Sequence, residues 1–135
     1  MTNKELLRIA ANARERAYAP YSDFFVGAAL LCDDGSIYEG CNIENASYTP
    51  TCCAERVALF KAVSEGKRGF KKIAIVGTKQ GDIAKYCYPC GVCRQALSEF
   101  CDHTFEIIVG TQNDVSSVTL GELLPNAFKI NQREG

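Results

Sequence analysis

Three cysteines and one glutamate stand at spacings that suit metal chemistry. The run Pro89-Cys90-Gly91-Val92-Cys93 places two thiols one helical turn apart at the start of an expected helix, where both can face one ion. By itself this Cys-x-x-Cys pattern is as typical of a redox pair or of half a structural zinc site. Cys53-Ala54-Glu55 adds a third thiol at the start of another expected helix.

Three thiolates leave the fourth tetrahedral position of a zinc ion open for water, as in catalytic rather than structural sites. Glu55, two residues after Cys53, would lie beside that position without binding the metal. A ligand-x-Glu element followed by Pro-Cys-x-x-Cys is the pattern of zinc-dependent nucleobase deaminases, in which the Glu transfers protons. The candidate zinc ligands are therefore Cys53, Cys90 and Cys93, and Glu55 is the candidate acid and base.

Composition favours a small-molecule partner. Fifteen Lys and Arg against sixteen Asp and Glu, without a block of like charges, offer no basic surface for nucleic acid. The chain has no apolar run long enough to cross a bilayer, and its polar start, Met1–Leu6, is unlike an export signal. We expect one domain over residues 1–135, located in the cytoplasm, with no nucleic-acid or membrane partner.

Eight cysteines could indicate a secreted disulfide scaffold, but such chains carry an export signal and have a small core. In a reducing compartment, clustered cysteines more often bind metal. Spacing from Glu55 favours Cys53 over its neighbour Cys52 as the ligand, and a register shift of one residue would exchange them. The single histidine, His103, is predicted to lie on the surface. The other cysteines are interpreted as apolar fillers or exposed thiols: Cys32, Cys41, Cys87 and Cys101.

Hydrophobic periodicity predicts alternating helices and strands. Helices are expected at 2–18, 53–65 and 91–100, a helical turn at 119–125, and strands at 25–31, 37–41, 73–76, 105–109 and 115–118. Asp34-Gly35 predicts a hairpin turn. This order predicts a layered α/β domain with a mixed sheet, in which a hairpin comes first and parallel strands joined by helical crossovers follow. Both cysteine motifs fall where ligands bind in such folds, beyond the carboxyl ends of strands.

The sequence resembles the small homotetrameric cytidine deaminases over almost its whole length. The resemblance implies a three-layer α/β sandwich with about five strands in a mixed sheet and helices on both faces. It also implies one zinc ion per subunit and hydrolysis of cytidine and 2′-deoxycytidine to uridine and 2′-deoxyuridine plus ammonia, in pyrimidine salvage. Two departures concern the rim of the pocket: Tyr88 is bulkier than the usual residue, and the loop 78–87 is longer. The matching segments are Tyr18–Ser22, Phe24–Leu31, Gly40–Ala46, Cys53–Arg56, Pro89–Gln95 and Leu123–Pro125.

The resemblance also implies contacts with the substrate. Phe24 resembles the aromatic residue that packs on the pyrimidine, and the backbone of Ala54 resembles the group that fixes the base carbonyl. Asn42 and Glu44 resemble the pair that hydrogen-bonds the ribose. Taken alone, Phe24 would be interpreted as a core residue and the two polar residues as loop residues.

Two further aromatic residues extend the resemblance to the oligomer. Tyr48 and Phe128 resemble residues that reach the site of a neighbouring subunit. The active sites of a homotetramer are then expected to be completed across its interfaces.

The charge of the metal cluster calls for compensation. Three thiolates outweigh the two positive charges of zinc, and two helix N-termini offset only part of the excess. Arg56 and Arg94 lie in first helical turns, where a cation is otherwise unfavourable, and could donate hydrogen bonds to the thiolates. We hypothesise that Arg56 has this role.

Three alternatives remain open from sequence. The same chemistry could act on a cytosine-containing antibiotic or on polynucleotides, although Asn42 with Glu44 favours a free ribose and the charge balance disfavours polynucleotides. A structural zinc module would need a fourth protein ligand, for which Cys52 or Cys87 is available. Thiol redox chemistry through the Cys-x-x-Cys pair predicts no bound metal and a reversible disulfide.

Overall fold

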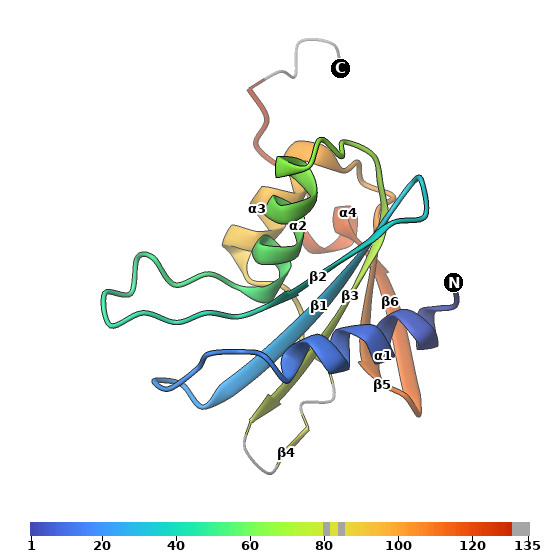
Figure 1. The fold of residues 1–135 in the computed structure, drawn as a ribbon. Helices are drawn as coiled ribbons and strands as arrows, with labels where there is room; N and C mark the ends of the chain where they lie inside the picture. The colour runs from blue at the N-terminus through green and yellow to red at the C-terminus, as the bar shows by residue number, and fades with distance from the viewer. Residues whose placement is uncertain (80–81, 84–85, 131–135) are drawn as a thin grey trace.

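The computed structural model describes residues 1–79, 82–83 and 86–130. No helix in the described part of the chain has the length and apolarity needed to cross a bilayer. The elements, in chain order, are α1 (Asn3–Arg14), β1 (Phe24–Cys32), β2 (Ile37–Cys41), α2 (Ala54–Ser64), β3 (Phe70–Lys79), β4 (Asp82–Ile83), α3 (Gly91–Phe100), β5 (Glu106–Thr111), β6 (Asp114–Thr119) and α4 (Leu120–Leu123) (Figure 1).

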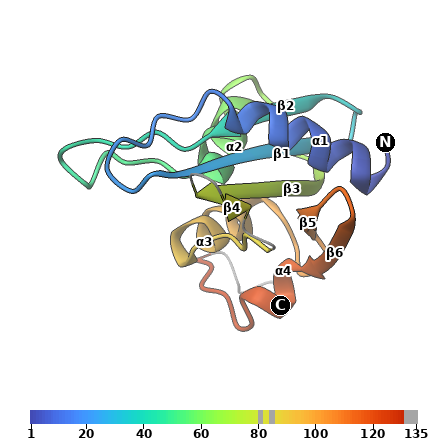
Figure 2. The same ribbon diagram turned by 90° about the horizontal axis from the view of Figure 1, so that it is seen from below.

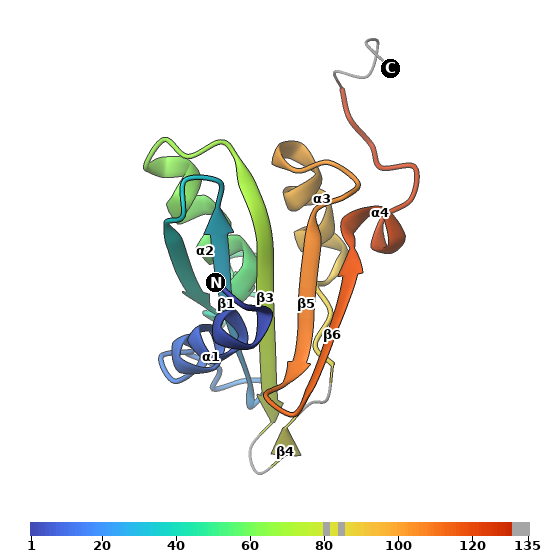
Figure 3. The same ribbon diagram turned by 90° about the vertical axis from the view of Figure 1, so that its right-hand side faces the viewer.

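The strands form one mixed sheet in the order β2-β1-β3-β5-β6, with β4 paired to β3. Strand β1 is antiparallel to both β2 and β3, β3 is parallel to β5, and β5 is antiparallel to β6. Figure 3 shows β3, β5 and β6 running side by side. The predicted mixed sheet is confirmed, with a hairpin first (β1 and β2) and then parallel strands, β3 and β5, joined by the crossover through α3. Helix α2 also connects two strands of the same direction, β2 and β3, and β1 lies between them, antiparallel to both.

Helices cover both faces of the sheet, as predicted. On one face, Leu6 and Leu7 of α1 pack with Ala29, Ala74 and Ile108 of the central strands. A second cluster on the other face joins those strands to α2 and α3, which contact each other and lie side by side in Figure 1. Figure 2 shows β1 between β2 and β3. The central strands are apolar at successive positions, rather than alternating, because both of their faces are buried.

The first helix ends earlier than the periodicity predicts. Thr2 caps it by accepting a hydrogen bond from the N–H of Glu5 at 3.1 Å, but the helix stops at Arg14 instead of Tyr18. The backbone of Tyr18 is hydrogen-bonded to the segment 42–44 instead. These hydrogen bonds join the segment between α1 and β1 to the loop that follows β2.

Gly40 lets α2 lie directly on the sheet. A Cβ atom at this position would stand 2.3 Å from the carbonyl oxygen of Ala54 and 2.6 Å from the nitrogen of Ala58. Both atoms belong to the backbone of α2. The absence of a side chain on Gly40 therefore determines how deeply the start of α2, with Cys53 and Glu55, is seated.

Candidate functional site

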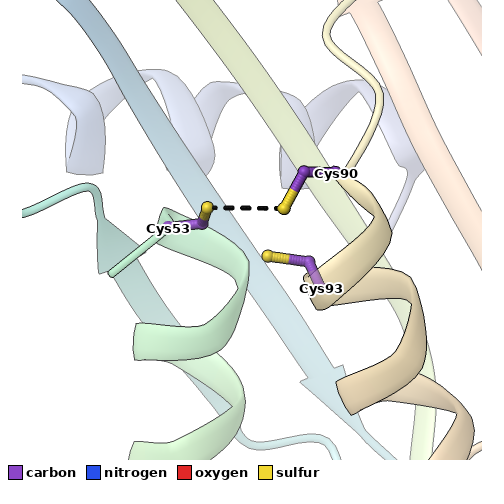
Figure 4. Close-up of side chains that lie close together, drawn as sticks. All are labelled: Cys53, Cys90 and Cys93. Carbon is purple, nitrogen blue, oxygen red and sulfur yellow. Dashed lines mark hydrogen bonds between the residues drawn. The ribbon is translucent and has the colours of Figure 1, made fainter. Parts of the chain in front are cut away.

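The three predicted ligand cysteines meet where α2 and α3 begin. Cys53 is the N-cap residue of α2, Cys90 is the N-cap residue of α3, and Cys93 lies in the first turn of α3 (Figure 4). Their three Sγ atoms all lie within 4.8 Å of one another. Cys52 is outside this cluster, and its backbone is paired with that of Ile43 instead. The structure therefore brings Cys53, and not Cys52, together with Cys90 and Cys93.

The cluster fits a zinc ion. Tetrahedral zinc with bonds of about 2.3 Å to sulfur sets neighbouring sulfurs about 3.8 Å apart. The Sγ atoms of Cys53 and Cys90 are 3.7 Å apart. Neither α2 nor α3 has a side-chain N-cap, so the unpaired N–H groups at both helix starts leave partial positive charge at the thiolate end. Soft thiolate donors in a tetrahedral arrangement select zinc over harder ions.

The thiols of the cluster alter one another's protonation. The pKa of Cys53 falls to about 5, first because of its hydrogen bond with Cys93 and further because of Arg56 and Cys90. The pKa of Cys93 is raised, first by the same hydrogen bond and then by burial. These opposite shifts describe one shared proton, because a second thiolate beside the first is unfavourable without compensation. A divalent cation bound between the sulfurs removes that repulsion.

The two candidate arginines differ. The Nη2 atom of Arg56 lies 3.6 Å from Sγ of Cys53, and the proximity of this thiol is the first cause of the raised pKa of Arg56. The buried Nε of Arg56 has no hydrogen-bond partner among the described residues. Arg94 was expected to contact the thiolates as well, and this is wrong. It donates to the carbonyl oxygens of Pro89 at 2.7 Å and Leu123 at 2.9 Å, and so ties the start of α3 to the end of α4.

Glu55 is a buried carboxyl group beside the cysteines. Its side chain lies in the first turn of α2, and the residue is 4% exposed. Burial raises its pKa to about 7, and the charge of Cys53 adds to this shift, whereas the peptide N–H of Glu55 and the Cys93 side chain oppose it. A carboxyl group with such a pKa can accept and release a proton near neutral pH.

A cavity of about 290 Å³ opens in front of this cluster. Its volume is near the lower end of the range for small-molecule sites. Ala54 also lines it, and the peptide N–H of this first residue of α2 has no acceptor within the helix. Tyr88 and Cys87 line the cavity, in agreement with the expectation that Tyr88 and the loop before it form the rim, whereas sequence reasoning gave Ser22, Val26 and Thr51 no role in the pocket. The complete lining is Ser22, Phe24, Val26, Asn42, Glu44, Thr51, Cys52, Cys53, Ala54, Glu55, Cys87, Tyr88 and Cys90.

Asn42 and Glu44 are both fixed by hydrogen bonds at the edge of the cavity. The Nδ2 atom of Asn42 donates to the carbonyl oxygen of Phe24 at 2.8 Å, and its Oδ1 accepts from the N–H of Val26 at 2.8 Å. One N–H and one lone pair of the Asn42 amide remain for a ligand. Hydrogen bonds from the turn 21–22 lower the pKa of Glu44, first the one from the serine hydroxyl, so its carboxylate is ionised at neutral pH.

Two predicted aromatics lie outside the cavity of a single chain. Tyr48 is 78% exposed and Phe128 is 69% exposed. Tyr48 lines a neighbouring hollow of about 350 Å³ that shares Ser22, Glu44 and Thr51 with the cavity. His103 is exposed, as predicted.

The family model for the cytidine and deoxycytidylate deaminase zinc-binding region matches residues 1–111. The chain belongs to this family. Cytidine deaminases from Sporosarcina psychrophila and Halalkalibacterium halodurans are 48% and 50% identical to it over 129 residues, which are 95% of this chain and 92% and 95% of theirs. The crystal structure of cytidine deaminase from Burkholderia pseudomallei matches with a TM-score of 0.86 and 48% identity, covering 95% of this chain and 100% of that one.

Membership of the cytidine deaminase family agrees with the site geometry. The family recognised from sequence, the α/β fold, the deaminase activity and the zinc cofactor are confirmed. The family model covers all three cysteines of the cluster and Glu55, together with the residues from 24 to 44 that line the cavity.

Proposed function

We propose that this chain hydrolyses cytidine and 2′-deoxycytidine to uridine and 2′-deoxyuridine, with release of ammonia, in pyrimidine salvage. The observation that carries the proposal is the position of buried Glu55 beside the three-cysteine cluster, at the inner end of a cavity of nucleoside size. Identity of about one half to cytidine deaminases along nearly the whole chain supports the same substrates.

Cys53, Cys90 and Cys93 would hold the zinc ion. When bound, zinc supplies the Lewis acidity that makes water nucleophilic at neutral pH. Glu55 accepts one proton of that water and delivers it to N3 of the base, then takes the second proton from the new hydroxyl group at C4 and delivers it to the leaving amino group. The oxygen of water forms a bond to C4, the C4–N bond breaks, and ammonia leaves. A pKa of about 7 lets Glu55 serve in both directions.

The remaining cavity residues recognise the nucleoside. The ring of Phe24 packs on the pyrimidine, and the peptide N–H of Ala54 donates to the base carbonyl. Asn42 and Glu44 bind the ribose, with the ionised carboxylate of Glu44 as an acceptor for a hydroxyl group. Arg56 stabilises the thiolate of Cys53 by its positive charge, which supports the proposed charge compensation.

A nucleoside fits this cavity better than a nucleotide. The charged side chains among its described lining residues are Glu44 and Glu55, and none of those residues is a Lys, Arg or His. A 5′-phosphate would meet negative charge without a compensating cation. A purely structural zinc site would need four protein ligands, whereas three sulfurs cluster in the described part of the chain.

We further propose that residues 1–135 form one catalytic domain of a cytoplasmic homotetramer whose sites are shared between subunits. Tyr48 and Phe128 would complete the site of a neighbouring subunit, which accounts for two large aromatics left in solvent in one chain. All eight cysteines are free thiols, which suits a reducing compartment.

The test is turnover of three substrates by metal-replete protein: cytidine, 2′-deoxycytidine and 2′-deoxycytidine 5′-monophosphate. Ammonia release and loss of the cytosine absorbance report the reaction. Both nucleosides should react, and the nucleotide should have a kcat/KM at least about 100-fold lower, because its phosphate faces carboxylates. Turnover of the nucleotide alone would contradict the assignment to nucleosides.

A further inference from the structure

The hydroxyl group of Ser22 joins two parts of the cavity. It accepts a hydrogen bond from the peptide N–H of Phe24 at 3.1 Å and donates one to Oε2 of Glu44. Ser22, Phe24 and Glu44 all line the cavity. A single side chain thus connects the strand that carries the Phe24 ring with the carboxylate of Glu44.

The local backbone explains how Ser22 reaches both groups. Asp23 has a φ of 59°, in the left-handed region, and its N–H donates to the carbonyl oxygen of Ala19 at 3.1 Å. This turn folds Ser22 back over the start of β1. The N–H of Glu44 donates to the carbonyl oxygen of Tyr18 at 2.9 Å, so the backbone of Glu44 is held against the same segment. The side chain of Glu44 is then oriented by hydrogen bonds from the turn 21–22, and the Ser22 hydroxyl is the donor to Oε2.

Counting acceptor sites shows which oxygen of Glu44 is available to a ligand. Its Oε1 accepts from the N–H groups of Tyr21 at 2.9 Å and Ser22 at 3.1 Å, whereas the Ser22 hydroxyl is the one donor to Oε2 among the described residues. A carboxylate oxygen offers two lone-pair sites. The Oε1 atom is therefore fully occupied, and a sugar hydroxyl must bond to Oε2, the atom that Ser22 holds.

We propose that Ser22 is a positioning residue for sugar recognition, because its hydroxyl fixes Oε2 of Glu44 relative to the base-packing ring of Phe24. This inference rests on the proposed function, in which Glu44 contacts the sugar and Phe24 the base. Without the hydroxyl, Oε1 keeps its two backbone donors, but Oε2 is free to turn about that anchor. The N–H of Phe24 also loses its acceptor.

The test compares Ser22 variants on two nucleosides that differ in their sugar hydroxyl groups. The kcat and KM of wild type, Ser22→Ala and Ser22→Thr are measured with cytidine and with 2′,3′-dideoxycytidine. Loss of a hydrogen bond to a charged group predicts that Ser22→Ala lowers kcat/KM for cytidine by about tenfold, mainly through KM. The dideoxynucleoside lacks the 2′- and 3′-hydroxyls, one of which Oε2 would bind, and should lose less than about threefold; Ser22→Thr should retain wild-type values because it keeps the hydroxyl.

Ser36→Ala is the matched control. The hydroxyl of Ser36 donates to Oδ1 of Asp34 at 2.6 Å, in the turn between β1 and β2 at the opposite end of β1. The Ser36→Ala substitution removes a comparable hydrogen bond between a serine and a carboxylate, far from the cavity. Both nucleosides should be turned over at wild-type rates by this variant.

The outcomes separate this inference from the proposed function. Wild type that turns over cytidine, with Ser22→Ala either unchanged or equally impaired on both nucleosides, overturns the inference and leaves the function standing. Wild type inactive on both nucleosides overturns both. If Ser22→Ala does not fold, Ser22→Cys takes its place, since a thiol is a weak donor and acceptor. It should show the same loss on cytidine relative to Ser22→Thr, and equal values for the two variants refute the proposal.

Discussion

Replacing Gly40 with alanine tests how the sheet positions the metal centre. The added Cβ would stand 2.3 Å from the carbonyl oxygen of Ala54, and ordinary contact begins near 3.4 Å. Because the contacted atoms are backbone, no side-chain rotation relieves the overlap, and α2 must move by about 1 Å. Overpacking of this kind lowers the free energy of unfolding by about 1–3 kcal/mol.

A movement of α2 distorts the metal site because the cysteine ligands and Glu55 lie on two different helices. Cys53 and Glu55 are carried by α2, whereas Cys90 and Cys93 are carried by α3. A shift of this size is a large fraction of the 3.7 Å between the sulfurs of Cys53 and Cys90. We expect zinc affinity to fall by about 10- to 100-fold and kcat/KM for cytidine to fall by about 100-fold.

The assay is competition for zinc with a chromophoric chelator, alongside thermal unfolding and steady-state kinetics. Gly91→Ala is the control, because a Cβ at Gly91 meets nothing within 4 Å although the residue adjoins Cys90. This control should retain wild-type zinc affinity and turnover. A Gly40→Ala protein with unchanged zinc affinity and unchanged kcat/KM would refute the reasoning.

Three further predictions concern the cavity, the cluster charge and the fold. In Gly77→Ala, the new Cβ would stand 2.7 Å from both Cζ of Phe24 and Sγ of Cys87, so both lining side chains must shift; steady-state kinetics should show KM for cytidine raised by about tenfold, and an unchanged KM would contradict this packing at the cavity. Arg56→Gln removes positive charge beside the cluster, so the acidic limb of the pH profile of kcat/KM should move to higher pH, and an unmoved limb rules out charge compensation. Lys67, whose Nζ is 2.6 Å from Oδ2 of Asp34, is the first cause of the lowered pKa of that carboxyl. The ion pair therefore adds to the free energy of unfolding in full above the ordinary Asp pKa, and this contribution is lost as pH falls toward the lowered pKa. Denaturant titrations should find Asp34→Asn less stable than wild type at pH 7, with the difference vanishing in acid. A difference in stability that does not depend on pH would contradict this.

The metal cluster was predictable because its spacings are local. Cys90 and Cys93 are one helical turn apart, so any helix over 91–100 brings them together. The distance from Glu55 favoured Cys53 over Cys52, and the structure shows the physical reason. The backbone of Cys52 pairs with that of Ile43, whereas Cys53 is the N-cap residue of α2 and its Sγ lies 3.7 Å from that of Cys90 at the start of α3.

Features that depend on contacts between distant segments were not predictable from sequence. Nothing local indicates that β1 lies between β2 and β3 in the sheet. Arg94 was assigned to the thiolates from its helical position, but the carbonyl oxygen of Leu123, far along the chain, accepts its hydrogen bond. The end of α1 at Arg14 likewise depends on the pairing of Tyr18 with the loop after β2.

The most direct test of the central claim, zinc-assisted deamination with Glu55 as the proton carrier, compares wild type with Glu55→Gln. Bound zinc and the absorbance of cytidine are measured on the same samples. We expect one zinc per chain in both proteins, with loss of the cytosine absorbance in wild type alone, because glutamine preserves the shape but cannot accept the proton. Wild-type protein with its full zinc content that leaves the cytidine spectrum unchanged, or a Glu55→Gln variant as active as wild type, would contradict the account.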